Sequence, residues 1–224
     1  MATAPDLAPA RIPSGHEDSV GSQAPGPLES VRSFLSLHDH EVGNDESFPP
    51  APATVEGWLR SRGLIGPEEP IGEPDLEWAL NVQNALRAMV HATAVGTTDR
   101  AAAGLLDEAA AEAGLRPRFG EAPSVRPQAH GVRGAVGSLL AVSFLAELDG
   151  SFRRLRECSA PDCTTVFFDR SRNRTAKWCS MAACGNRSKV RRFRERERER
   201  SRSRAAVGPG ETTVHGAPSG EARS

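Results

Sequence analysis

The clearest periodic pattern along the chain covers residues 72–94, where apolar side chains recur every three or four positions. This spacing places them on one face of an α-helix. Pro74 suits the first turn of a helix, and the acidic side chains of Asp75 and Glu77 suit its positive N-terminal end. We therefore expect a long amphipathic helix, whose inner face consists of Leu76, Ala79, Leu80, Gln83, Leu86 and Val90.

Four further segments have helical spacing and recognisable ends. Thr54 and Asp99 are candidate N-caps, and Gly63 and Gly114 are candidate helix ends. The last segment is almost entirely apolar, so we expect it to be buried. Together with two short strands, these helices predict a mostly α-helical domain over residues 29–150. The helices are expected at 29–41, 55–62, 99–113 and 134–149, and the strands at 115–119 and 124–129.

Both ends of the chain are rich in Pro, Gly and Ser and lack hydrophobic periodicity. We expect residues 1–28 and 205–224 to be disordered tails. The sequence has no run of about 18 apolar residues, so we expect no membrane span. It also has no apolar segment behind a basic start, so we expect no secretory signal. We expect a cytoplasmic, nucleoid-associated protein without membrane contact, in which thiols stay reduced.

The net charge of −1 conceals a strong separation of charge along the chain. Residues 151–204 contain 17 Lys and Arg against 6 Asp and Glu, a net charge of +11, whereas the remainder contains 11 against 23, a net charge of −12. Arginine abundance alone is weak evidence in a chain this rich in Ala, Gly and Pro, but its clustering is informative. An acidic body with a basic module is typical of a nucleic-acid-binding protein.

All four cysteines lie in the basic segment, as the pairs Cys158-x4-Cys163 and Cys179-x4-Cys184 with fifteen residues between them. Two close pairs joined by a loop can supply four thiolates to one tetrahedral Zn²⁺. A disulfide needs an oxidising compartment, and redox thiols favour Cys-x2-Cys spacing, so both interpretations are weaker. Since all six histidines lie elsewhere, we expect one structural zinc ion held by four cysteines, with no open position for catalysis.

The residues between and after the cysteine pairs predict a β-hairpin followed by a helix. Residues 164–168 are β-branched or aromatic, and residues 175–178 would form the returning strand after a turn. Ser180 is a good N-cap for a helix over about residues 181–200. A tight turn that carries a cysteine pair (a knuckle), then a hairpin and then a helix are typical of a treble-clef zinc fold. We therefore expect a small treble-clef-like zinc module over residues 151–204.

The stretch CSAPDCTTVFFDRSRNRTAKWCSMAACGNRSKVRRFRER closely resembles the Cys-Gly-Asn-Arg (CGNR) zinc finger. The preceding residues 29–150 resemble the ABATE domain that accompanies this finger, notably in VRSFLSLHD, TVEGWLRSRGL and LRPRF. Most members have Asn-Thr in the first of these segments, where this chain has Ser36-Leu37. The resemblance implies a bacterial transcription regulator, linked to stress, with zinc on the four cysteines. Its hallmarks here are Cys158, Pro161-Asp162-Cys163, Phe168-Asp169-Arg170-Ser171, Trp178-Cys179-Ser180-Met181, Cys184-Gly185-Asn186-Arg187 and Lys189-Val190-Arg191-Arg192.

The predicted helix after the second cysteine pair would carry most of the nucleic-acid contacts. Arginine forms bidentate hydrogen bonds with phosphate and guanine, and asparagine can pair with adenine. For Asn186 and Arg187, an alternative role is to hydrogen-bond the thiolates or backbone of the knuckle. The candidates are Asn186, Arg187, Lys189, Arg191, Arg192 and Arg194 on the helix, with Arg170, Arg172 and Arg174 in the hairpin turn.

The leading hypothesis is a DNA-binding transcriptional regulator whose helical domain senses a small-molecule effector or self-associates. An RNA-binding protein and a protein-interaction adaptor are the alternatives. Phe167, Phe168 and Trp178 are more typical of a small core than of a base-stacking platform. An enzyme is disfavoured, because the sequence shows no Ser/His/Asp arrangement, phosphate-binding glycine loop or open metal site.

Overall fold

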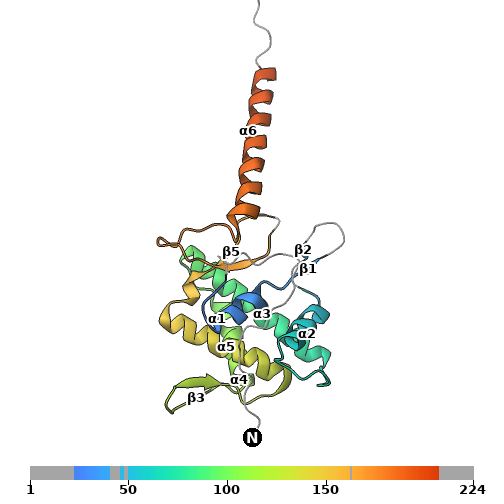
Figure 1. Cartoon of the computed structure of the whole chain (residues 1–224), viewed down its shortest axis with the longest axis vertical. Helices are drawn as coiled ribbons and strands as arrows, with labels where there is room; N and C mark the ends of the chain where they lie inside the picture. The colour runs from blue at the N-terminus through green and yellow to red at the C-terminus, as the bar shows by residue number, and fades with distance from the viewer. Residues whose placement is uncertain (1–22, 41–45, 48–49, 162, 207–224) are drawn as a thin grey trace, which may run out of the picture. The chain divides into compact units, whose positions relative to one another are not determined.

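The computed structural model describes residues 23–40, 46–47, 50–161 and 163–206. The tails expected to be disordered fall largely outside this range, at residues 1–22 and 207–224. The chain divides into two compact units, one that ends at Gly185 and one that begins at Asn186 (Figure 1). The described residues are mostly helical with short two-stranded hairpins, which confirms the expected fold class.

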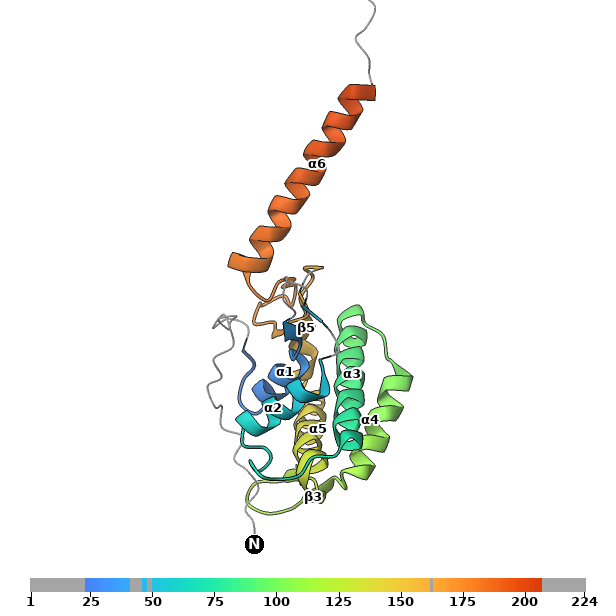
Figure 2. The ribbon, with the colours of Figure 1, turned by 90° about the vertical axis from the view of Figure 1, so that its right-hand side faces the viewer.

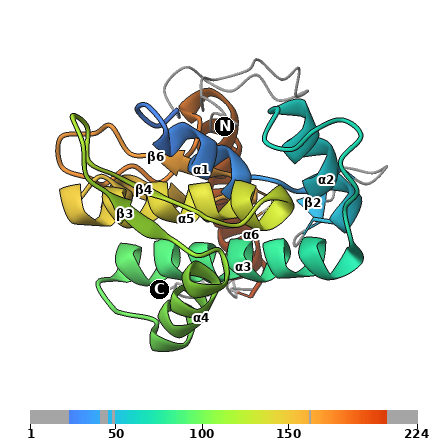
Figure 3. The ribbon, with the colours of Figure 1, turned by 90° about the horizontal axis from the view of Figure 1, so that it is seen from below.

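The first unit is built around a set of packed helices. Figures 2 and 3 show the long helices α3 and α5 side by side, with α4 next to them and α1 on another side of α5. Their inner faces meet in a core whose fully buried side chains include Phe34, Leu59, Leu86, Val136 and Leu139. The helices are α1 (Leu28–Leu35), α2 (Pro52–Ser61), α3 (Glu73–Val95), α4 (Arg100–Glu112) and α5 (Gly131–Asp149).

Local sequence signals explain most of the helix ends. The Asp99 carboxylate accepts a hydrogen bond from the Ala102 N–H at 3.0 Å, so the predicted N-cap of α4 is confirmed. Gly96 and Gly150 end α3 and α5 in the left-handed conformation, with φ of 75° and 77°. The predicted N-cap Thr54 is wrong, because α2 already begins at Pro52. Proline lacks a backbone N–H and therefore suits a first helical position.

Two hairpins accompany the helices. The expected strand pair is confirmed as β3 (Arg116–Arg118) and β4 (Ser124–Arg126), which are antiparallel. The helix predicted over residues 29–41 ends earlier than expected, at Leu35. It is followed by β1 (Asp39–His40), which pairs antiparallel with β2 (Glu46–Ser47).

The hairpin of the cysteine segment has a different partner strand from the one predicted. The segment at 164–168 does contain a strand, β6 (Val166–Phe168). It pairs with β5 (Leu155–Glu157), which precedes the first cysteine and follows the short helix η1 (Phe152–Arg154). Residues 175–178, the predicted returning strand, form no strand. The first cysteine pair therefore lies in the loop that connects the two strands.

A helix follows the second cysteine pair, as predicted. It opens with a π-helical turn, η2 (Met181–Gly185), and the Ser180 hydroxyl accepts from the Ala183 N–H at 3.2 Å, which confirms the predicted cap. The second unit begins with α6 (Asn186–Ala206), which extends beyond the expected end at residue 200.

By length and composition, α5 is the one helix within the described chain that could cross a membrane. Half of its apolar window is buried inside the first unit, where it contacts α1, α3 and α4. This half forms part of the core. Phe144, Leu145 and Leu148 are exposed, so the expectation that the whole apolar helix is buried is only partly met.

The close packing of α5 generates a testable contrast between two glycines. A Cβ at Gly137 would lie 2.8 Å from the Cβ of Ala113, whereas a Cβ at Gly104 on α4 would meet nothing within 4 Å. We expect Gly137→Ala to lower the free energy of unfolding by about 1–3 kcal/mol through overpacking. Gly104→Ala should raise it by up to about 1 kcal/mol through helix propensity. Denaturant unfolding of both variants checks this, and equal stabilities would contradict the described approach of α5 to Ala113.

Candidate zinc centre

The four cysteine sulfurs gather at one point of the first unit. All four Sγ atoms lie within 4.8 Å of one another, with 3.7 Å between Cys163 and Cys179 and 3.6 Å between Cys179 and Cys184. In a tetrahedral site with Zn–S bonds of about 2.3 Å, neighbouring sulfurs lie about 3.8 Å apart. All four thiols are free of disulfide bonds. The spacing and the donor set therefore fit one zinc ion, as the sequence predicted.

Backbone hydrogen bonds shape the two knuckles. At the hairpin end, the N–H of Cys158 donates to the Thr165 carbonyl at 3.0 Å, and the N–H of Cys163 donates to Ala160 at 3.1 Å. The knuckles are joined by the Ser159 N–H, which donates to the Lys177 carbonyl at 2.8 Å. The fifteen residues between the pairs thus fold back on themselves, and this fold brings Cys179 to Cys163.

The second knuckle ends in a glycine that packs closely against its neighbours. A Cβ on Gly185 would lie 2.8 Å from the Met181 sulfur and 3.3 Å from the Trp178 ring. Met181 is exposed and could move to admit a Cβ, so the glycine fits the close packing of the π-helical turn over Met181–Gly185 without such a shift. This gives the Gly of the Cys-Gly-Asn-Arg motif a packing role beside the fourth sulfur.

Crowding of the thiols controls their protonation. The hydrogen bond to Cys163 raises the pKa of Cys158 to about 12. Hydrogen bonds from Cys158 and Cys179 lower the pKa of Cys163, whereas the hydrogen bonds of Cys179 with Cys158 and Cys163 raise the pKa of Cys179. One thiolate is thus stabilised by its neighbours' protons, but four thiolates at this spacing need a cation among them. A bound zinc ion supplies that charge, and its binding releases the remaining protons.

A buried carboxylate organises the loop between the knuckles. Asp169 is fully buried, and it accepts from the Ser171 N–H at 2.8 Å and from the Ala176 N–H at 3.0 Å. Burial alone would raise the pKa of Asp169, but the hydrogen bonds from Ser171 and Ala176 and the nearby Arg156 charge outweigh it, so the pKa is lowered. The charged form of Asp169 therefore holds both ends of the loop at neutral pH.

Polar contacts tie the cysteine segment to the helical core. The Arg87 guanidinium on α3 donates to the Thr164 carbonyl and to the Glu157 carboxylate, at 2.8 and 2.7 Å. From α1, Arg32 donates to the Val166 carbonyl at 3.1 Å. The Ser36 hydroxyl, just after α1, accepts from the Val166 N–H at 3.1 Å. The hairpin of β5 and β6, here called the zinc hairpin, is thus hydrogen-bonded to α1 and α3 and to the segment just after α1, within one unit.

These supporting residues were missed by sequence reasoning. Asp169 had a local signal, because an Asp followed two residues later by Ser commonly forms a side-chain turn. Arg87 had none, since its partner Glu157 lies 70 residues away. The aromatic prediction is confirmed for Phe167 and Phe168, which are buried, and Trp178 packs against the cysteine cluster.

The hairpin-turn arginines differ in how they are used. Arg170 donates from Nε and Nη2 to the Gln23 carbonyl, at 3.3 and 3.0 Å, and lies over the Phe168 ring at 5.8 Å from its centre. Arg170 is exposed like the other two, and part of its hydrogen-bonding capacity is used within the first unit. Arg172 and Arg174 are exposed, and Arg174 adopts a left-handed conformation with φ of 53°. Of the turn residues, Arg172 and Arg174 are the better candidates for contacts with a partner.

The remaining candidates lie on α6. Asn186, Arg187, Lys189, Arg192 and Arg194 are exposed, and Arg191 is half-buried. They begin two residues after Cys184, so the metal site fixes the backbone from which the helix starts. Their contact with nucleic acid stays a prediction.

A four-cysteine site that leads directly into a basic helix defines a zinc-finger protein. Residues 154–197 match the CGNR zinc finger. Residues 38–151, just over half of the chain, match the ABATE family, described as "Putative stress-induced transcription regulator". The chain therefore belongs to the ABATE family, with its domain followed by a CGNR zinc finger. A search of the curated proteins finds no match to this chain.

The role of Asp169 can be tested by replacing its carboxylate with a neutral group of the same shape. We expect Asp169→Asn to lower the free energy of unfolding of the zinc-loaded protein by about 1–3 kcal/mol, because one amide oxygen cannot replace both carboxylate acceptors. Glu121→Gln, at an exposed carboxylate, is the matched control and should change stability little. Denaturant unfolding at pH 7 measures both. Equal stabilities would show that the loop does not depend on the buried charge.

Proposed function

We propose that the protein is a DNA-binding transcriptional regulator in which the zinc centre anchors α6 as the DNA-contacting element. The membership of the ABATE family, the four-cysteine site and the basic segment support this proposal. In this role the protein is a non-catalytic, cytoplasmic, nucleoid-associated protein, and the helical domain either senses an effector or self-associates.

The observation that carries the proposal is the placement of cations around α6. Successive residues of an α-helix are about 100° apart, so residues spaced by three or four share a face. Two basic stripes result, on roughly opposite sides of the helix. One stripe contains Arg187, Arg191, Arg194 and Arg198, and the other contains Lys189, Arg192, Arg196 and Arg200.

Two opposite basic stripes suit the major groove of DNA. A helix in this groove has a phosphate backbone on each side, so cations are needed on both flanks. Between the stripes, one face carries Val190, Phe193 and Glu197, and the other carries Glu195 and Glu199. The second face would repel phosphate, so it is expected to point away from DNA.

The first face has groups that can contact base edges. Val190 and Phe193 are exposed on α6, at 48% and 62%. Apolar side chains contact the thymine methyl group, and a carboxylate such as Glu197 can accept from cytosine N4. In this arrangement Asn186 and Arg187 lie at the N-terminal end of the recognition helix, next to the knuckle.

Duplex DNA is favoured over single-stranded nucleic acid by the burial of the aromatic residues. Single strands are bound mainly by stacking of bases on exposed aromatic rings. Phe167 and Phe168 are buried here. Among the described residues of α6 and of the cysteine segment 158–184, the exposed aromatic ring is that of Phe193. Competition between duplex DNA and structured RNA for the protein separates the two partners.

The stripe geometry predicts a specific change in salt dependence. For the variant Arg194→Gln/Arg198→Gln, we expect the slope of log K against log salt to fall by about two, because each lost phosphate contact removes about 0.9. The matched control Arg100→Gln/Arg118→Gln changes two exposed arginines outside α6 and should leave the slope unchanged. Fluorescence anisotropy with labelled duplex at several salt concentrations measures this.

The same experiment has outcomes that would contradict the proposal. If both double variants reduce the slope equally, the protein binds through its overall charge and α6 is not the contact surface. If the zinc-loaded protein shows no salt-sensitive binding to duplex at micromolar concentration, the proposal of a DNA-binding regulator fails.

A further inference from the structure

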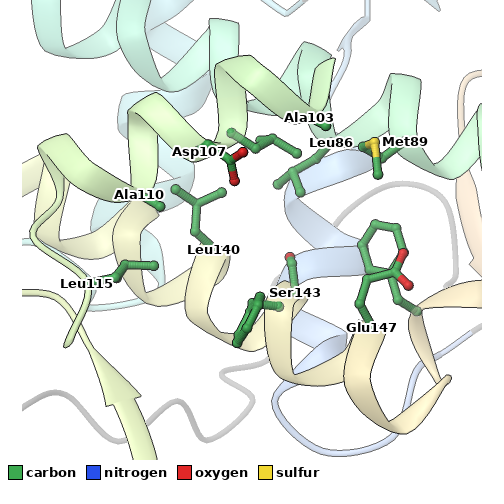
Figure 4. A pocket seen from close by; sticks show the side chains of 12 residues that line it. Leu86, Met89, Ala103, Asp107, Ala110, Leu115, Leu140, Ser143 and Glu147 are labelled. Carbon is green, nitrogen blue, oxygen red and sulfur yellow. The ribbon is translucent and has the colours of Figure 1, made fainter. Parts of the chain in front are cut away.

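A cavity of about 200 Å³ lies in the first unit between α3, α4 and α5 (Figure 4). Most of its lining is apolar and comes from all three helices, including Leu86, Met89, Leu106 and Leu140. Phe152, from the segment just before β5, also lines the cavity. An engineered apolar cavity of about 150 Å³ binds benzene, so this cavity has room for a ring with a short substituent.

The polar side chains that line the cavity can all accept hydrogen bonds. Figure 4 shows the carboxylates of Asp107 and Glu147 and the hydroxyl of Ser143 among the lining side chains. The buried Ser143 hydroxyl donates its proton to the Leu139 carbonyl at 2.9 Å, so its oxygen can only accept from a ligand. A ligand that satisfies these groups must be a hydrogen-bond donor.

The charge of the cavity has one sign. Asp107 and Glu147 are acidic, and no basic residue lines the cavity. Arg153 lies 3.8 Å from the Glu147 carboxylate, but its side chain is 63% exposed, so this pair is a weak surface contact. Asp107 makes no such pair among the described residues. The site therefore favours a cation over an anion of the same shape.

A ligand can enter beside α5. Phe144, which lines the cavity, is 54% exposed, and Asp107 on the facing helix is exposed as well. The apolar interior is thus open at an edge that carries the acidic groups. This arrangement suits a molecule with an apolar body and one charged end, because the body can be buried while the charge stays near water.

We propose that this cavity is a binding site for a small apolar amine in its ammonium form, such as an arylalkylamine. The apolar body packs against Leu86, Met89 and Leu140, and the ammonium group lies at the open edge near Asp107. That the amine binds in this cavity is inferred from the cavity alone. That the bound amine acts as the effector of a regulator rests on the proposed function.

The position of the cavity connects it to the zinc hairpin. Phe152 precedes β5, the strand that leads to Cys158. Leu86 is followed by Arg87, which donates to Glu157 and Thr164 on either side of the first cysteine pair. A ligand that packs against Leu86 and Phe152 therefore borders the residues that hold the hairpin on the helical core.

The test uses three probes of one shape and different charge, titrated calorimetrically into the full-length zinc-loaded protein. These are 2-phenylethylamine, the neutral 2-phenylethanol and the anionic 3-phenylpropanoate. We expect the amine to bind about tenfold more tightly than the alcohol, and the carboxylate to bind most weakly, because a charge-assisted hydrogen bond adds roughly a decade of affinity. Equal affinities for amine and alcohol, or no binding of any probe at millimolar concentration, would overturn the proposal.

Adjacent residues on α4 provide a matched pair of variants. Asp107→Asn should reduce the preference for amine over alcohol by about three- to tenfold, whereas Glu108→Gln, an exposed neighbour outside the cavity, should preserve it. Ala110→Leu, which fills the cavity, should weaken amine and alcohol alike. Equal effects of Asp107→Asn and Glu108→Gln would show a response to net charge and would refute the site.

Neither measurement contains DNA, so their failure is separate from failure of the proposed function. Duplex binding is recorded independently by anisotropy, with and without 2-phenylethylamine. Binding of the amine without DNA binding would support the cavity site and refute the regulator, and the reverse result would do the opposite.

Discussion

Four sulfur atoms within 4.8 Å of one another form the constraint on which the rest of the structure depends. Thiolates at this distance repel one another strongly unless a cation lies among them. The apolar cluster around them is small, with Cys158, Ala160 and Cys184 as its buried members. The knuckles are therefore held by metal coordination and backbone hydrogen bonds, and little by hydrophobic burial.

The zinc hairpin is part of the helical unit. Arg87 and Arg32 donate from α3 and α1 to carbonyl groups next to the first cysteine pair, and Ser36 pairs with Val166 between the same elements. The ABATE match ends at residue 151 and the CGNR match begins at residue 154, but the first compact unit continues to Gly185. Both strands of the hairpin lie within the CGNR match, but they are held by hydrogen bonds from helices that precede this match. Among the described residues, the second unit consists of α6.

The elements that depend on local signals could be predicted from the sequence. The stripe of α3, the Asp99 and Ser180 caps and the pairing of β3 with β4 follow from spacing and capping within a few residues. The metal site was also predictable, because four cysteines at matched spacing permit few arrangements. Features that depend on partners far apart in the sequence could not be predicted. The pairing of β5 with β6 across the first cysteine pair needs the helices that pack against both strands, and Arg87 finds its partners only in the folded unit.

The central claim is that one zinc ion on Cys158, Cys163, Cys179 and Cys184 holds the knuckle from which α6 begins. The most direct measurement is elemental analysis of protein purified under reducing conditions, for the wild type and for Cys184→Ser. The account predicts one zinc ion per wild-type chain and a much lower content in the variant. A wild-type chain that holds no stoichiometric zinc would contradict it.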